Sequence, residues 1–144
     1  MNEKKFIGTW KLKSFETKLS NGGIVLYPNG KNPIGYIMYS EDGYMSVLIT
    51  DKDRRNFDGN ASPSKDFWKT VDDYKKAEAY ETLLSYCGKY EVKNENLIVH
   101  HIKASSLPNW VGTSQERIYK FSANTLTLSA TTANSEAVLV WEHI

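Results

Sequence analysis

Short runs of β-favouring residues recur along the chain at fairly even intervals, separated by turn residues. The turns contain Gly and Asn, which tolerate the positive φ angles of tight hairpins, as in Asn21-Gly22-Gly23 and Glu41-Asp42-Gly43. This pattern predicts an all-β antiparallel fold, either a sandwich or a barrel of about eight to ten strands, rather than a parallel sheet with helical crossovers. The expected strands are 8–18, 24–28, 34–40, 44–51, 84–93, 96–104, 113–121, 125–131 and 137–143.

One segment departs from the strand pattern. Between Ser64 and Leu84 the apolar residues lie three and four positions apart among Lys, Asp and Glu, and they are Phe67, Val71, Tyr74, Ala77, Tyr80 and Leu84. That period predicts one amphipathic helix inserted into the β fold. Its apolar stripe must be buried somewhere, so we expect it to cover an open end of the barrel, as a lid would, or a face of the sheet.

Alternation along each strand predicts which side chains point into a barrel. In strand 96–104, His100 shares a face with Ile98 and Ile102, whereas the opposite face carries Lys103 and is expected to meet water. The same reading, with the tyrosine-bearing faces placed inside, gives the expected interior residues. These are Tyr36, Met38, Met45, Tyr86, Tyr90, His100, Arg117 and Tyr119.

Each of these residues has two interpretations. The inward tyrosines are either core residues whose hydroxyls find backbone acceptors or the walls of a ligand cavity. His100 is either a neutral core histidine or a proton donor and acceptor for a ligand, and Arg117 is either a cation stacked on an aromatic ring or a polar contact for that ligand.

No motif in the sequence predicts a metal or a cofactor. Adjacent residues on a strand point to opposite faces, so His100 and His101 cannot chelate one ion together. There is no phosphate-binding loop, dinucleotide fingerprint, nucleophile elbow or HExxH sequence. Hydrolase, kinase and dehydrogenase functions therefore have no motif to support them.

Composition narrows the function classes further. The 144 residues carry a net charge of +1, too balanced for the multiple phosphate contacts of nucleic-acid binding, and a lone cysteine excludes an intramolecular disulfide. No apolar stretch is long enough to span a membrane and no leader is evident, so we expect a cytoplasmic protein with one domain over residues 1–144. The oligomeric state stays open, a homodimer included.

Several stretches together resemble the bacterial and fungal lipocalin-like domain family. They are Gly8-Thr9-Trp10-Lys11-Leu12, 33–39 with 42–47, 86–92, Val99-His100-His101, 108–112 and Leu126-Thr127-Leu128. The first contains the Gly-x-Trp signature of lipocalins, and the set spans almost the whole chain.

The resemblance implies a calycin-type antiparallel barrel with an internal cavity. In such barrels the Trp matching Trp10 closes one end and is usually covered by an Arg from the last strand. Here the last strand reads Trp141-Glu142-His143, so either His143 or Arg117 must cover Trp10.

Three functions follow from these observations. The first is binding of a small hydrophobic or aromatic molecule, with the interior residues named above as walls and polar contacts. The second is an isomerase, cyclase or dehydratase of natural-product type, in which His100 and a tyrosine such as Tyr90 shuttle protons and Arg117 stabilises negative charge. The third is a barrel filled by its own side chains that serves as a structural or interaction protein.

Overall fold

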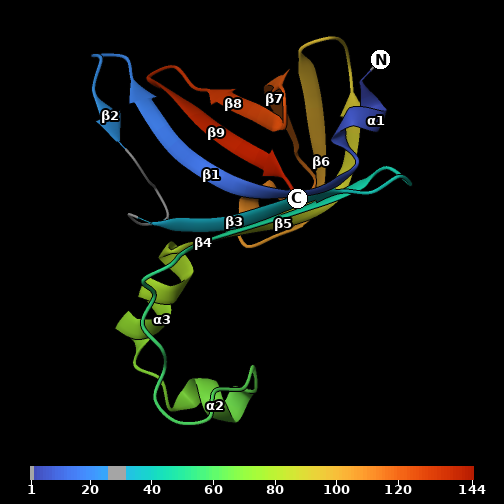
Figure 1. The fold of residues 1–144 in the computed structure, drawn as a ribbon. Coiled ribbons are helices and arrows are strands. Elements are labelled where there is room, and N and C mark those ends of the chain that lie inside the picture. The colour runs from blue at the N-terminus through green and yellow to red at the C-terminus, as the bar shows by residue number, and fades with distance from the viewer. Residues whose placement is uncertain (1, 26–31) are drawn as a thin grey trace.

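The computed structural model describes residues 2–25 and 32–144, and over these residues the chain forms an antiparallel β-barrel (Figure 1). The strands are β1 (Gly8–Leu19), β2 (Ile24–Val25), β3 (Pro33–Tyr39), β4 (Tyr44–Asp51), β5 (Leu83–Val92), β6 (Leu97–Ser105), β7 (Ser114–Ser122), β8 (Thr125–Thr131) and β9 (Ser135–His143). The helices are α1 (Glu3–Phe6), α2 (Lys65–Lys69), α3 (Asp73–Glu81) and the 3-10 turn η1 (Pro108–Trp110). The predicted fold class is confirmed.

The barrel closes because β1 has partners along both of its edges. One edge pairs with β9 from Trp10 opposite His143 to Leu19 opposite Ser135, with an irregularity between Leu12 and Ser14. The other edge pairs with β3 along its first half and with β2 near its end. Within the described residues, eight strands, β1 and β3 to β9, therefore form the closed sheet, and β2 is a short addition beside β1.

The strand boundaries agree with the expected ranges to within a few residues. The expected strand at 24–28 is present as Ile24–Val25, and its remaining positions, 26–28, lie outside the described residues. The three-residue turn η1 and the four-residue helix α1 were not predicted, because segments this short carry no readable period.

The expected continuous helix at 64–84 is wrong. The chain forms α2 and α3, with a break at Thr70–Asp72, and residues 83 and 84 already belong to β5. The break has local causes, since the Thr70 side chain bonds back to the Phe67 carbonyl and Asp72 takes an extended conformation before α3. Neither helix has a buried residue, so there is no continuous apolar stripe to seal the barrel.

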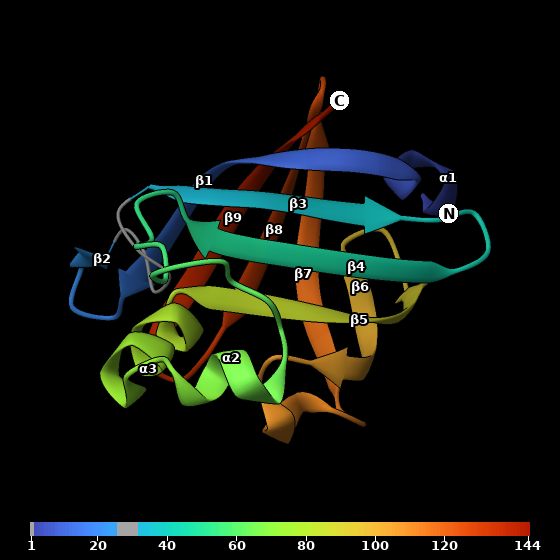
Figure 2. The ribbon, with the colours of Figure 1, turned by 90° about the horizontal axis from the view of Figure 1, so that it is seen from below.

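The two helices project from the barrel between β4 and β5 (Figures 1 and 2). Phe57, Phe67 and Trp68 stack their rings edge to face within this insertion. Arg55 forms two hydrogen bonds with the Glu78 carboxylate, 2.7 and 2.8 Å long, which tie the loop after β4 to α3. The insertion thus has its own contacts outside the barrel.

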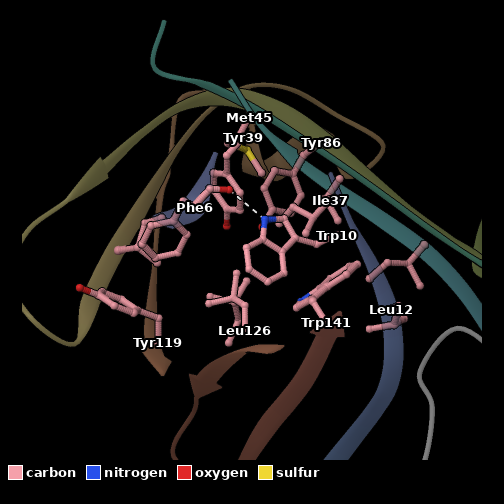
Figure 3. Close-up of a cluster of buried hydrophobic side chains, with 14 of the residues drawn as sticks. Phe6, Trp10, Leu12, Ile37, Tyr39, Met45, Tyr86, Tyr119, Leu126 and Trp141 are labelled. Carbon is pink, nitrogen blue, oxygen red and sulfur yellow. Dashed lines mark hydrogen bonds between the residues drawn. The ribbon is translucent and has the colours of Figure 1, made fainter. Parts of the chain in front are cut away.

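One end of the barrel is closed by aromatic rings. Trp10 donates its indole N–H to the Phe6 carbonyl at 2.8 Å, so α1 is fastened across this end. The imidazole of His143 meets the Trp10 ring edge to face at 4.7 Å, and Figure 3 shows Trp10 among the other buried side chains. His143, rather than Arg117, therefore covers Trp10.

Gly88 is required by close packing between β5 and β6. The pairing of these strands shifts register between Cys87 and Gly88. A Cβ atom at Gly88 would lie 1.9 Å from the carbonyl oxygen of His101. Any larger side chain must push two paired backbones apart.

We expect Gly88→Ala to lower the free energy of unfolding by about 1–3 kcal/mol or more, because the added methyl group overlaps backbone atoms that cannot rotate away. Urea denaturation followed by tryptophan fluorescence measures this loss. Lys89→Ala, at the next and exposed position, is the matched control and should change stability by less than about 0.5 kcal/mol. Equal effects in the two variants would contradict this account of the β5–β6 contact.

Candidate functional site

The barrel interior contains a cavity of about 540 Å³. Its walls come from strands on all sides, and most of them are apolar: Phe15, Ile37, Ile49, Leu128, Leu139 and Trp141. Ring faces and branched aliphatic chains present no hydrogen-bonding groups, so these walls favour an apolar or aromatic molecule.

Polar residues gather at one side of this cavity. Ser114, Gln115, Glu116 and Arg117 come from the start of β7, Thr131 ends β8, and Thr132 follows it. No residue of α2 or α3 lines the cavity, so the expected role of the inserted helix as a lid is not seen in this structure.

Arg117 lies at the cavity with its charge unpaired. Its guanidinium stands 6.0 Å from the centre of the Trp110 ring and donates a 2.8 Å hydrogen bond to the Glu116 carbonyl. Within residues 2–25 and 32–144 it forms no ion pair with a carboxylate. Arg117 therefore lies against an aromatic ring, as one interpretation expected, and it also borders the cavity, where its contact with a ligand stays a prediction.

His100 lies between two phenols behind the cavity wall. Its Nε2 is 2.8 Å from the Tyr39 hydroxyl and its Nδ1 is 2.8 Å from the Tyr86 hydroxyl. The imidazole is only 1% exposed, which agrees with the inward direction expected from alternation. We call these three residues the Tyr39–His100–Tyr86 chain.

Burial keeps all three members of this chain uncharged at neutral pH. Desolvation, aided by electrostatic interactions with Arg117 and His101, lowers the pKa of His100 to about 3. Desolvation also raises the pKa of Tyr39 well above its ordinary value and raises the pKa of Tyr86, although Arg117 opposes both rises. A neutral imidazole carries one N–H and one acceptor nitrogen, so it bonds to both hydroxyls.

Two of the residues expected inside point outward. Tyr36 is 38% exposed and Met38 is 51% exposed, so they do not line the interior. The inward residues of β3 are Ile37 and Tyr39, which pair with Val47 and Met45 of β4. Both faces of β3 carry large apolar residues, so alternation alone did not distinguish them, whereas the register with β4 does.

Three further expected residues point inward but lie away from the cavity. Met45 is buried in the core. The hydroxyl of Tyr90 donates to the Ser40 carbonyl at 2.8 Å, and that of Tyr119 donates to the Asn94 carbonyl at 2.7 Å. The expected residues that do line the cavity are Tyr86 and Arg117, with His100 directly behind Tyr86. Tyr90 does not share a hydrogen bond with His100, so the structure does not bring that expected pair together.

Two tryptophans of the cavity wall were missed. Trp110 stands in η1, where no period reveals its direction, and its ring meets Tyr86 edge to face at 5.6 Å. Trp141 follows from alternation in β9, because it shares a face with Ala137 and Leu139. Its indole N–H is buried and has no hydrogen-bond partner among the described residues.

A closed antiparallel barrel with an internal cavity is the architecture of calycin-type binding proteins. The chain matches the family described as "Lipocalin-like domain" over residues 7–144, and it belongs to that family. The resemblance drawn from the sequence is confirmed.

A named relative is similar to part of the chain. It is the 4'-hydroxy-3'-methoxypropiophenone carrier protein of Aspergillus oryzae, 36% identical over 64 residues. The match covers 40% of this chain and 58% of the relative.

Two other features of the described residues bear on the class of site. No helix there has the length and apolar character needed to cross a membrane. Across the same residues no three His, Cys, Asp or Glu side chains gather as metal ligands would.

The low pKa of His100 predicts a pH-dependent stability. The unfolded chain takes up a proton at His100 as the pH falls through about 6.5, whereas the folded protein does so only near pH 3. Acid therefore favours the unfolded state within this window, and glutamine at position 100 removes the effect. We expect the stability advantage of the wild type over His100→Gln to shrink by about 2 kcal/mol between pH 7 and pH 5.

Urea denaturation of both proteins at several pH values gives this difference directly. The range above pH 5 avoids most carboxylate titration, and His101 and His143 are present in both proteins. An advantage that stays constant from pH 7 to pH 5 would show that His100 is not held neutral by the fold.

Proposed function

We propose that this barrel binds a small apolar or aromatic molecule in its cavity and carries it without changing it chemically. The cavity itself is the observation that carries the proposal. Its volume of about 540 Å³ is in the usual range for small-molecule sites, about 300–1,000 Å³. A barrel filled by its own side chains would have no such space, so the third sequence hypothesis loses its basis.

The similarity to the named relative supports the same function independently of the cavity. Its name describes it as a carrier of an aromatic ketone. A phenyl ring with short substituents suits walls made of Phe15, Trp110, Trp141 and branched aliphatic side chains. We therefore take 4'-hydroxy-3'-methoxypropiophenone as the first candidate ligand for this chain.

Blocking the cavity provides the test of binding. Ala137 lines the cavity, and Val138 is the next residue of β9 and points to the other face. We expect Ala137→Trp to abolish the fluorescence rise of N-phenylnaphthylamine and the thermal stabilisation by the candidate ketone, because the indole occupies the space. Val138→Trp adds the same group outside the cavity and should leave both signals intact.

Loss of both signals in Val138→Trp as well would mean that β9 had been disturbed rather than the cavity filled. A comparison of the two unfolding transitions resolves this point. Binding that survives in a folded Ala137→Trp protein would exclude the barrel cavity as the binding site.

Catalysis of proton transfer is a second candidate function, and the Tyr39–His100–Tyr86 chain is the observation that favours it. Neutral imidazole between two phenols can exchange hydrogens in both directions next to a bound ketone. Such an enzyme would speed the exchange of hydrogen for deuterium at the carbon beside the carbonyl of the candidate ketone in heavy water.

Mass spectrometry of the ketone after incubation distinguishes the two functions. A carrier leaves the exchange rate at its uncatalysed value. An accelerated rate that falls in His100→Gln would establish the enzyme and overturn the proposal of a passive carrier.

A further inference from the structure

The Tyr39–His100–Tyr86 chain contains one more hydrogen than its own hydrogen bonds use. Each hydroxyl supplies one hydrogen and the neutral imidazole supplies one, whereas the chain has two contacts, both 2.8 Å long. The hydroxyl that accepts the imidazole N–H keeps its own hydrogen for a different acceptor. The tautomer of His100 thus decides whether Tyr39 or Tyr86 carries the spare hydrogen.

The surroundings of the two hydroxyls are unequal. Tyr39 is 2% exposed, its ring is enclosed by those of Phe6 and Tyr90, and among the described residues its hydroxyl bonds only to His100. Tyr86 lines the cavity beside Arg117. A donor buried without an acceptor is costly, so the spare hydrogen belongs on Tyr86, where a molecule in the cavity can accept it.

Two other residues at the cavity also offer donors, whereas the acceptor Glu116 is an exposed residue. Among the described residues, the buried indole N–H of Trp141 has no hydrogen-bond partner and the guanidinium of Arg117 forms no ion pair with a carboxylate. The Gln115 amide donates one of its two hydrogens to the Thr113 hydroxyl at 3.0 Å. Tyr86, Trp141 and Arg117 thus present donors to the cavity from β5, β9 and β7.

We propose that the cavity selects an apolar or aromatic molecule that bears acceptor oxygens, such as a ketone or a carboxylate, and that His100 is the positioning residue that keeps Tyr86 a donor toward it. This inference rests on the proposed binding function and gives its ligand class. Ligands whose polar group is only a donor, such as an ammonium group, are rejected, because they leave the buried donors of Tyr86 and Trp141 unpaired and meet the charge of Arg117.

Four naphthalenes substituted at the same ring position test the selection. They are ethylnaphthalene, acetonaphthone, naphthoate and naphthylmethylammonium, and each competes with N-phenylnaphthylamine for the wild-type protein. We expect acetonaphthone and naphthoate to bind more tightly than ethylnaphthalene, and the ammonium compound to bind most weakly. The measured quantity is the preference ratio, the affinity for acetonaphthone divided by that for ethylnaphthalene.

Variants of the donors should change this ratio. Tyr86→Phe and Trp141→Phe each remove one donor and keep an aromatic ring, so we expect the ratio to fall about fivefold to tenfold in one or both. A variant that only loosens the packing of the cavity weakens the binding of both compounds equally and leaves the preference ratio unchanged. Met38→Leu, on the outward face of β3, is the control that should leave the ratio at its wild-type value.

Two substitutions of His100 test its positioning role. Glutamine keeps one acceptor and one donor in the side chain and should preserve the ratio, whereas leucine offers neither and should lower it. Should His100→Leu fail to fold, the Tyr86→Phe and Trp141→Phe ratios decide the selection. A folded His100→Gln protein that loses the wild-type ratio would overturn the positioning role.

The outcomes separate the inference from the proposed function. Binding of ethylnaphthalene with a ratio that neither donor variant changes would overturn the inference and leave the carrier function standing. Failure of the fluorescent probe and of every naphthalene to bind would overturn both.

Discussion

The pairing of β1 with β9 is the constraint on which the rest of the structure depends. Strands at the two ends of the chain meet over the length from Trp10 to Leu19, and this contact turns an open antiparallel sheet into a barrel without free long edges. Closure also sets the position of the cavity, because the inward residues of every strand then face one enclosed space. The same contact brings His143 onto Trp10 at the end that α1 covers.

Much of this architecture could be predicted from the sequence. Turn residues at regular intervals predicted the strands of an all-β fold, and the resemblance to lipocalin-like domains implied that these strands form a barrel. The facing of β6 was also readable, since Lys103 on one side and Ile98 and Ile102 on the other placed His100 inside. The inward face of β3 could not be predicted in this way, because Tyr36 and Met38 are as apolar as the residues of β3 that point inward. Only the register of Tyr39 opposite Met45 resolves it, and register depends on the partner strand.

At the candidate site, too, local sequence patterns predicted some features, whereas features that depend on contacts distant in the sequence could not be predicted. Tyr86 and Arg117 were predicted to face the interior and do line the cavity. The role of His100 depends on Tyr39 and Tyr86, which are 61 and 14 residues away, and no local period reveals such contacts. Trp141 was treated only as part of the terminal Trp-x-His sequence, although alternation with Ala137 and Leu139 already places it inside. One continuous helix was wrongly predicted for the inserted segment, because the apolar spacings of three and four persist across Thr70–Asp72, where the helix breaks.

A molecule with an acceptor oxygen is proposed to enter the barrel and to bond to donor groups that have no partner among the described residues. The indole N–H resonances of the four tryptophans, assigned by substitution and followed by NMR as acetonaphthone is added, test this claim directly. The account predicts a downfield shift of the Trp141 resonance, while the Trp10 resonance stays in place because its N–H is already bonded to Phe6. A saturating ligand that leaves Trp141 unmoved, or that shifts only the exposed Trp68, would contradict it.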